Sequence, residues 1–279
     1  MIDRDDLARV IRTALEEDLR YGPDATTEAT VPADAVATAE LTPRSAGVLA
    51  GIPAALAVFE QVVPDLVVVS AQEDGSAAVA GQPALVLRGN TRALLTAERT
   101  ALNLVCHLSG IATATAEWVR EIAGTKAAVR DSRKTLPGLR LLEKYAVRCG
   151  GGVNHRLGLG DAILIKDNHV VAAGSVGKAI AAARAHAPDL FLEVEVDGLA
   201  QLDEALAEGV ELVLLDNFSA SDCAKAVQRA QGTGTRLEAS GGLTLAVARE
   251  YAQTGVDYLA VGALTHSSPV LDLGMDLRG

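Results

Sequence analysis

The chain has few cysteines and few aromatic residues. Its three cysteines, Cys106, Cys149 and Cys223, are an odd number and form no CxxC pair, so neither a disulfide framework nor a zinc cluster is indicated. Such sparse cysteine fits a reducing compartment. One Trp, four Tyr and three Phe residues leave few platforms on which nucleic-acid bases could stack.

Basic residues are also fewer than acidic residues. The chain has 25 Lys and Arg residues against 36 Asp and Glu residues, which gives a net charge of −11. An acidic protein repels a phosphate backbone, so we exclude nucleic acid as a partner. The five histidines show no HExxH or other metal-ligand spacing, so transition-metal catalysis is not favoured either.

Long apolar runs are absent. No uninterrupted apolar stretch reaches the length of a membrane span. The N-terminus, MIDRDDLARV, is charged where a signal peptide needs a basic start followed by an apolar run. The sequence therefore predicts a soluble, cytoplasmic protein with no membrane partner.

What the chain does have is enough apolar sequence for a large core. With 49% hydrophobic residues and 26 glycines in 279 residues, it fits one α/β barrel, or a barrel with a modest second domain. Residues 3–19 have helical spacing, and residues 36–90 have short apolar runs between glycines, typical of strands and turns. Residues 91–123 are helical again, which predicts two helices broken at Ser109-Gly110 and a domain boundary near residue 110.

Beyond that boundary, strands and helices alternate. The predicted strands are 127–131, 162–166, 191–196, 212–216, 236–239 and 258–261. The predicted helices are 139–148, 176–186, 199–208, 220–230 and 245–254. This alternation indicates parallel strands joined by right-handed crossovers, so we expect an α/β N-terminal domain at 1–110 and an α/β barrel at 111–267. An open doubly wound sheet is the competing architecture, but no GxGxxG follows a first strand.

One stretch is cationic although the protein is acidic. Residues 130–169, RDSRKTLPGLRLLEKYAVRCGGGVNHRLGLGDAILIKDNH, hold eight Lys and Arg residues against four carboxylates. The simplest use of such a stretch is to bind a small, multiply charged anion. Within it, Arg140, Lys144 and Arg148 share one helix face, for which a solvated surface is the first interpretation and a contact with a partner subunit the second.

Polar residues fall at the end of each predicted strand. In a barrel these ends meet at one mouth, so residues far apart in the sequence become neighbours. In chain order they are Arg133 and Lys134, Lys166, Glu195, Asp216, Ser240 to Gly242, and Gly262 with Ala263. The cations, with Arg156, predict a cradle for carboxylates and phosphates, against the alternative of scattered surface charge. The glycines after the last two strands lie where barrels commonly bind phosphate.

Carboxylates alternate along the segment FLEVEVD. Glu193 and Glu195 are expected to point into the barrel, where an unpaired carboxylate would be costly. Their partners could be Lys166, a substrate hydroxyl or Mg²⁺. Glu195 and Asp216 suit Mg²⁺ and sugar hydroxyls, whereas a buried salt bridge with a mouth lysine is an equal alternative for Glu193.

In their order and spacing these motifs resemble one enzyme family. The block DSRKTLPGLRLLEKYAVRCGGGVNHRLGLGDAILIKDNH, with ERTALNLVCHLSGIAT upstream and EVEV, LLDN, EASGG and VGALTHS downstream, is similar to quinolinate phosphoribosyltransferases. That family joins quinolinate to phosphoribosyl diphosphate, releasing diphosphate and CO₂ to give nicotinate mononucleotide in NAD synthesis. The resemblance spans nearly the whole chain. It implies this reaction and an incomplete, TIM-like α/β barrel, with the tail at 268–279 returning to the smaller N-terminal α/β domain.

The resemblance also implies roles for individual residues. It places the quinolinate carboxylates on Arg133, Arg156 and Lys166, with His155 nearby. It makes Lys134 a phosphoribosyl diphosphate ligand and Glu195 and Asp216 the ribose and Mg²⁺ carboxylates, so these three are the expected catalytic residues. Further substrate-binding positions are Arg99, Ser132, Ser240, Gly241, Gly242, Gly262, Ala263 and His266. Arg99 matches an arginine that the neighbouring subunit supplies, which implies a homodimer.

Three other hypotheses stay open from the sequence. A transferase of the same build could act on nicotinate, which needs fewer basic groups because one carboxylate is missing. A Schiff-base aldolase could use Lys166 as its nucleophile. A non-catalytic anion-binding protein is the third, and release of diphosphate that depends on both substrates would reject it.

Overall fold

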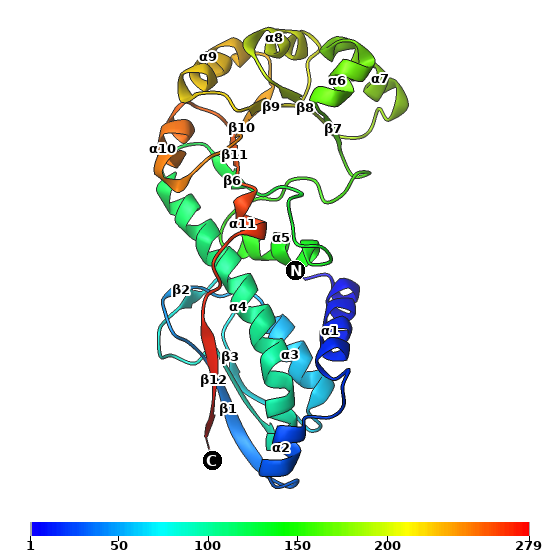
Figure 1. Cartoon of the computed structure of the whole chain (residues 1–279). Coiled ribbons are helices and arrows are strands. Elements are labelled where there is room, and N and C mark those ends of the chain that lie inside the picture. The colour runs from blue at the N-terminus through cyan, green and yellow to red at the C-terminus, as the bar shows by residue number, and fades with distance from the viewer. Residues whose placement is uncertain (1, 279) are drawn as a thin grey trace. The chain divides into compact units, whose positions relative to one another are not determined.

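The computed structural model describes residues 2–278 as two compact units (Figure 1). The N-terminal unit comprises the chain up to Ala116, Thr135–Gly151 and the residues from Ala263 onward. The barrel unit comprises Glu117–Lys134 and Gly152–Gly262. This division differs from a single cut at residue 110, because a segment in the middle of the sequence groups with the N-terminal unit.

The N-terminal unit is built on an antiparallel sheet in the order β12-β1-β5-β3. Its strands are β1 (Val36–Pro43), β2 (Gly47–Val48), β3 (Val67–Ala71), β4 (Ala77–Ala78), β5 (Leu85–Asn90) and β12 (Leu273–Arg278). Its helices are α1 (Arg4–Asp18), α2 (Ala25–Thr30), α3 (Ile52–Val62), α5 (Arg140–Cys149) and α11 (Ala263–His266), with the first part of α4 (Thr91–Glu121). Strand β12 runs along β1, so the segment Leu273–Arg278 is part of this sheet.

Helix α4 is continuous, and the break predicted at Ser109-Gly110 is wrong. Glycine is needed there for a different reason. A Cβ on Gly110 would lie 2.2 Å from the carbonyl oxygen of Pro269, so the absence of a side chain allows the C-terminal segment to approach the helix backbone.

The barrel unit contains a six-stranded parallel sheet in the order β6-β11-β10-β9-β8-β7. Its strands are β6 (Ala128–Arg130), β7 (Ile163–Ile165), β8 (Leu192–Val196), β9 (Leu212–Asp216), β10 (Arg236–Ser240) and β11 (Tyr258–Ala260). Its helices are α6 (Asp167–Ala173), α7 (Val176–His186), α8 (Leu199–Ala207), α9 (Ala220–Ala230) and α10 (Leu245–Gln253). The helices cover the outer face of the curved sheet (Figure 1). The predicted parallel α/β architecture is confirmed, and since β6 and β7 stay at the sheet's edges the barrel is incomplete.

Capping residues account for where several of the barrel helices begin. Ser175 and Ser219 accept hydrogen bonds from the backbone N–H groups of Lys178 and Asp222, which satisfy donors in the first turns of α7 and α9. Helix α6 was not predicted from the sequence. It is short, and none of its residues is buried, so it lacks the apolar periodicity by which a helix is recognised.

The interpretation of Arg140, Lys144 and Arg148 as a solvated face is wrong for the middle residue. Lys144 is fully buried, whereas Arg148 is exposed. Glu143 beside it is also buried, and its carboxylate accepts a hydrogen bond from the backbone N–H of Leu136 and contacts the Nε2 atom of His107 at 2.9 Å. Helix α5 therefore carries charge into the interior of the N-terminal unit. None of the helices described is both long and apolar enough to cross a membrane.

Candidate active site

The carboxyl ends of the six parallel strands bring most of the predicted site residues of the barrel unit to one edge of the sheet, which we call the mouth. Asp216 and Ser240 pair directly at the ends of β9 and β10. Glu195 lies near the end of β8, beside β9, and Lys166 follows β7 directly. Parallel strands in register bring these residues together although 74 positions separate Lys166 from Ser240 in the sequence.

The segments that follow the first and last strands of the barrel unit, β6 and β11, meet at Gly262. The backbone N–H of Lys134 donates to Oγ of Ser132 at 3.1 Å, which fixes the turn after β6. A Cβ on Gly262 would lie 2.9 Å from Cδ of Lys134 and 3.3 Å from Oγ of Ser132. Glycine at this position therefore lets the Lys134 side chain lie against the loop that follows β11.

A second glycine joins the ends of β9 and β10. Gly241 has a φ of +97°, and a Cβ there would lie 2.2 Å from Oδ1 of Asn217. The N–H of Asn217 donates to the carbonyl of Ser240, and its side-chain amide donates to Asp216. The backbone after Ser240 is thus held close to the Asp216 carboxylate, as a phosphate or sugar site needs.

Two arginines at the mouth carry buried donors that the protein does not satisfy. The Nε atoms of Arg133 and Arg156 are buried without a hydrogen-bond partner among the described residues. Burial, and then the positive charge of Arg133, lower the pKa of the Arg156 guanidinium. Two like charges held near each other with unpaired donors are stabilised by an anion that contacts both. This arrangement is the strongest indication of ligand chemistry in the chain.

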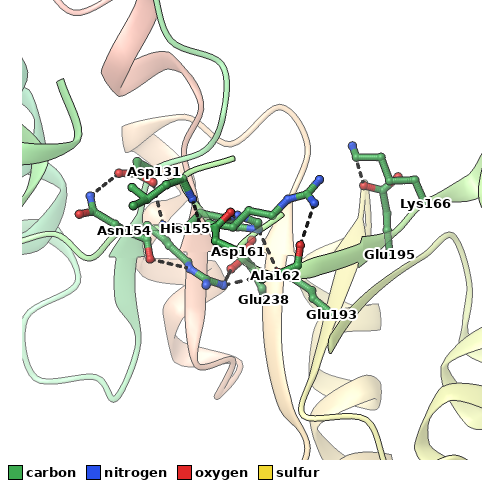
Figure 2. A network of polar contacts seen from close by, with 12 residues as sticks. Asp131, Asn154, His155, Asp161, Ala162, Lys166, Glu193, Glu195 and Glu238 are labelled. Carbon is green, nitrogen blue, oxygen red and sulfur yellow. Dashed lines mark hydrogen bonds and ion pairs between the residues drawn. The ribbon is translucent and has the colours of Figure 1, made fainter. Parts of the chain in front are cut away.

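Buried charges lie in the interior of the barrel unit beside the mouth (Figure 2). Glu193 contacts Nε2 of His155 at 2.9 Å and lies 3.8 Å from Arg130, whereas Arg130 donates to Glu238 at 2.6 Å. The partners of Glu193 are therefore an imidazole and a guanidinium rather than the mouth lysine considered from the sequence. Burial raises the pKa of both Glu193 and Glu238 to about 7.

The group His155, Glu193 and Glu238 has the composition of a metal site, since ligand atoms of the three lie within 4.8 Å of one another. The Arg130 guanidinium, however, already contacts the carboxylate of Glu238. A cation of the protein thus occupies this part of the cluster, and the arrangement is that of a buried ion-pair network.

The sequence missed several residues of the site. Arg130, Glu238 and Asn217 were not selected, although strand alternation places Glu238 on the same face as Ser240, two residues along β10. Arg99, Ala263 and His266 belong to the N-terminal unit, so their part in the site stays a prediction. A cavity of about 970 Å³ in that unit has none of the predicted site residues in its lining.

The barrel unit is an incomplete α/β barrel whose mouth carries lysines, carboxylates and the two arginines with unsatisfied donors. This combination defines an enzyme that acts on multiply charged anions. Comparison with known proteins gives the particular family. The model of the quinolinate phosphoribosyl transferase C-terminal domain matches residues 111–276, and that of the N-terminal domain matches residues 24–109. The chain belongs to the quinolinate phosphoribosyltransferase family, so the resemblance inferred from its motifs is confirmed.

Individual relatives agree over the whole chain. It is 60% identical to the carboxylating nicotinate-nucleotide pyrophosphorylase of Mycobacterium leprae, over 98% of both chains. It is 37% identical to a mitochondrial decarboxylating quinolinate phosphoribosyltransferase of Nicotiana tabacum, over 98% of this chain and 82% of the relative. The structure of the nicotinate-nucleotide pyrophosphorylase from Francisella tularensis superimposes with a TM-score of 0.95 at 39% identity, covering 100% of this chain and 98% of the other.

Proposed function

We propose that this enzyme transfers the phosphoribosyl group of phosphoribosyl diphosphate to quinolinate, with loss of CO₂, and so makes nicotinate mononucleotide and diphosphate for NAD biosynthesis. Membership of the family supports the reaction. The observation that ties the reaction to this chain is the pair of buried Nε donors on Arg133 and Arg156, for which residues 2–278 supply no partner. Two neighbouring guanidinium groups can each donate a pair of hydrogen bonds to a carboxylate, so together they fit a planar dicarboxylate.

Quinolinate binds, in this proposal, between Arg133, Arg156 and Lys166, with His155 beside them. Arg156 already donates one N–H to the carbonyl of Ala162, so its remaining donors have a fixed direction. Lys166 extends from the end of β7 and is 46% exposed, which leaves its ammonium accessible to a carboxylate. Binding then replaces repulsion between cations with charge-assisted hydrogen bonds.

Phosphoribosyl diphosphate binds along the other half of the mouth. Lys134 and Ser132 lie against Gly262, and Ser240, Gly241 and Gly242 present backbone at the end of β10. Backbone N–H groups of glycine loops can approach phosphate oxygens closely. The family resemblance adds Ala263 and His266 to this set.

The carboxylates of Glu195 and Asp216 act on the ribose. Breaking the bond between C1 and diphosphate develops positive charge on the sugar ring, which Glu195 and Asp216 can stabilise, while Lys134 neutralises the departing diphosphate. No nucleophilic side chain is needed, so the protein contributes positioning and charge complementarity. Ribosylation makes the pyridine nitrogen cationic, which stabilises the electron pair left on the adjacent ring carbon when its carboxylate departs as CO₂, and that carbon then takes up a proton.

Mg²⁺ is part of the proposal. Glu195 and Asp216 offer oxygen ligands from neighbouring strands, which is the donor type that Mg²⁺ prefers. When bound, the ion would reduce the negative charge of the diphosphate. Glu195 also contacts Lys166 at 3.3 Å, so the carboxylate is held at the mouth by protein contacts alone.

The enzyme is proposed to act as a cytoplasmic homodimer in which Arg99 enters the neighbouring site. Arg99 is exposed on α4, and an exposed arginine can supply the further cation that two polyanionic substrates call for. The three cysteines are free thiols, which fits a reducing compartment.

An absorbance assay for mononucleotide formation from quinolinate, phosphoribosyl diphosphate and Mg²⁺ tests the function. Turnover of nicotinate but not quinolinate would reject the substrate. The shared site is tested by mixing two inactive variants, Arg99→Ala and Lys134→Ala. Activity should return in the mixture, because mixed dimers contain one site free of both substitutions. No recovery after verified subunit exchange would reject the entry of Arg99 into the neighbouring site.

A further inference from the structure

Both ring nitrogens of His155 are engaged within the barrel unit. Its Nδ1 atom accepts the backbone N–H of Arg156 at 2.7 Å, and its Nε2 atom lies 2.9 Å from Oε2 of Glu193 (Figure 2). The residue is 7% exposed. Its backbone N–H donates to Oδ1 of the buried Asp131 at 2.8 Å, so the backbone beside the ring is held as well.

These contacts fix the protonation of the ring. A nitrogen that accepts an N–H has no proton of its own, so Nδ1 is the bare atom and Nε2 carries the hydrogen. Nε2–H then donates to Glu193, the only geometry in which both contacts are favourable. A proton on Nδ1 would break the hydrogen bond to Arg156.

The hydrogen bond to Nδ1 bears on where the Arg156 guanidinium lies. Among the residues that the structure describes, the Arg156 side chain donates one hydrogen bond, from Nη1 to the carbonyl of Ala162 at 3.0 Å, and its buried Nε has no partner. The position of the guanidinium also depends on the Arg156 backbone, which the hydrogen bond to Nδ1 holds in place. An error of about 1 Å at a substrate-positioning group can cost roughly a hundredfold in rate.

We propose that Glu193 and His155 are positioning residues that orient Arg156 toward a carboxylate of quinolinate through the neutral, Nε2-protonated imidazole. This inference rests on the proposed function, because it assigns Arg156 to quinolinate. It gives His155, which the resemblance places near the quinolinate carboxylates, a role that passes through Arg156. Glu193 is thereby assigned an indirect part in the reaction, in place of the salt bridge, substrate hydroxyl or Mg²⁺ considered for it from the sequence.

The surrounding charges keep this arrangement in place. Glu193 is faced by Arg130 from β6 and Glu238 from β10, with Lys166 and Glu195 at the mouth. The Arg130 guanidinium stacks over the ring of Tyr258, a residue of β11, with Cζ 4.9 Å from the ring centroid. Since Arg130 contacts Glu238 more closely than Glu193, the Oε2 atom of Glu193 remains available to His155.

The first test needs no substitution. Nitrogen chemical shifts of the His155 ring, recorded on the whole protein near pH 7, should report a neutral ring with its proton on Nε2. A ring protonated on Nδ1, or on both nitrogens, overturns the inference whatever the activity of the enzyme.

The second test separates positioning from direct contact. Glu193→Leu should raise the KM for quinolinate roughly tenfold or more and change the KM for phosphoribosyl diphosphate less than about twofold. Glu193→Gln is the matched control, because its side-chain oxygen still accepts from Nε2–H, and it should keep a quinolinate KM near that of the wild type. Equal increases in both KM values, or no rescue by glutamine, overturn the inference.

A double-mutant cycle gives the coupling. In an Arg156→Ala background, Glu193→Leu should add little to the quinolinate KM, since its effect passes through the missing guanidinium. A full, additive increase overturns the inference. Failure of the wild type to convert quinolinate would instead reject the proposed function, so the two failures are distinct. If Glu193→Leu does not fold, His155→Asn and His155→Gln replace it: asparagine can accept at the Nδ1 position and should retain more quinolinate affinity than glutamine.

Discussion

Nζ of Lys166 lies 3.3 Å from Oε2 of Glu195, at the ends of neighbouring strands β7 and β8. The two partners differ in exposure, because the lysine side chain is 46% exposed and the glutamate side chain only 12% exposed. The lysine can therefore meet a second carboxylate while it still neutralises the first. This is the geometry expected of a cation that binds one substrate beside a carboxylate that serves the other.

Lys166→Ala should raise the KM for quinolinate roughly 10- to 100-fold, the range of one lost charge-assisted hydrogen bond. Lys178→Ala, at an exposed lysine on α7, is the control and should leave both KM values unchanged. Steady-state kinetics with each substrate varied measures the effect. A covalent adduct on Lys166, trapped by borohydride in the presence of substrate, would contradict this role and favour Schiff-base chemistry.

The two glycines after β10 should respond differently to alanine. Gly241→Ala places a Cβ 2.2 Å from Oδ1 of Asn217 at a φ of +97°, so unfolding free energy should fall by about 1–3 kcal/mol. Gly242 has a φ of +60° and nothing within 4 Å of an added Cβ. Gly242→Ala should therefore cost less stability and act mainly on the KM for phosphoribosyl diphosphate.

Urea unfolding and substrate kinetics on the two variants check this expectation. The same loss of stability for Gly241→Ala and Gly242→Ala would show that the contact with Asn217 does not constrain the turn. An unchanged KM for phosphoribosyl diphosphate in Gly242→Ala would remove Gly242 from the phosphate site.

The parallel strands were predictable because their signal is local. Apolar runs such as Leu212–Asp216 end in polar residues at regular intervals, and the alternation of Glu193 and Glu195 with aliphatic residues gives the inward face. The pairing of strands creates contacts that the local sequence does not reveal. Nothing in the sequence pairs Arg130 with Glu238, which are separated by 108 positions and meet only when β6, β11 and β10 assemble.

Residues whose type has two structural uses were the ones misread. Lys144 has the spacing of a solvated face, yet it is buried, since burial of a charge depends on partners that periodicity does not reveal. Glycine is the weakest helix former after proline, so Gly110 in a helical pattern predicts a break. Its actual role, close approach by Pro269, depends on a segment more than 150 residues later.

Alanine at Gly110 tests that role. The backbone there is helical, so alanine would favour the isolated helix by up to about 1 kcal/mol. Because the new Cβ would lie 2.2 Å from the Pro269 carbonyl oxygen, we expect a net loss of about 1–3 kcal/mol in unfolding free energy. Gly177→Ala, within α7, is the matched control: its Cβ would find only the flexible Glu208 side chain, at 3.4 Å, and it should stabilise. Stabilisation by both substitutions would contradict the close approach.

The buried carboxylate of Glu193 should make stability depend on pH. Burial raises its pKa from 4.5 to about 7 in the folded protein. Between these values the folded state binds more protons than the unfolded state, so the stabilisation is complete below about pH 4.5 and is lost as the pH rises through about 7. Glu193→Gln removes this titration and keeps the shape of the side chain. The variant should therefore gain stability relative to the wild type between pH 5 and pH 8, by a few kcal/mol at most.

Chemical unfolding of both proteins at several values between pH 5 and pH 8 measures that difference. Glu117→Gln, which removes a carboxylate at an exposed position of α4, is the control for the change in net charge and should give a smaller change across the range. A difference that moves in the opposite direction, with the wild type gaining on Glu193→Gln as the pH rises, would mean that Arg130 and His155 stabilise the ionised carboxylate by more than burial disfavours it. The pKa of Glu193 would then lie below 4.5, and the charge cluster beside the mouth would be fully ionised at neutral pH.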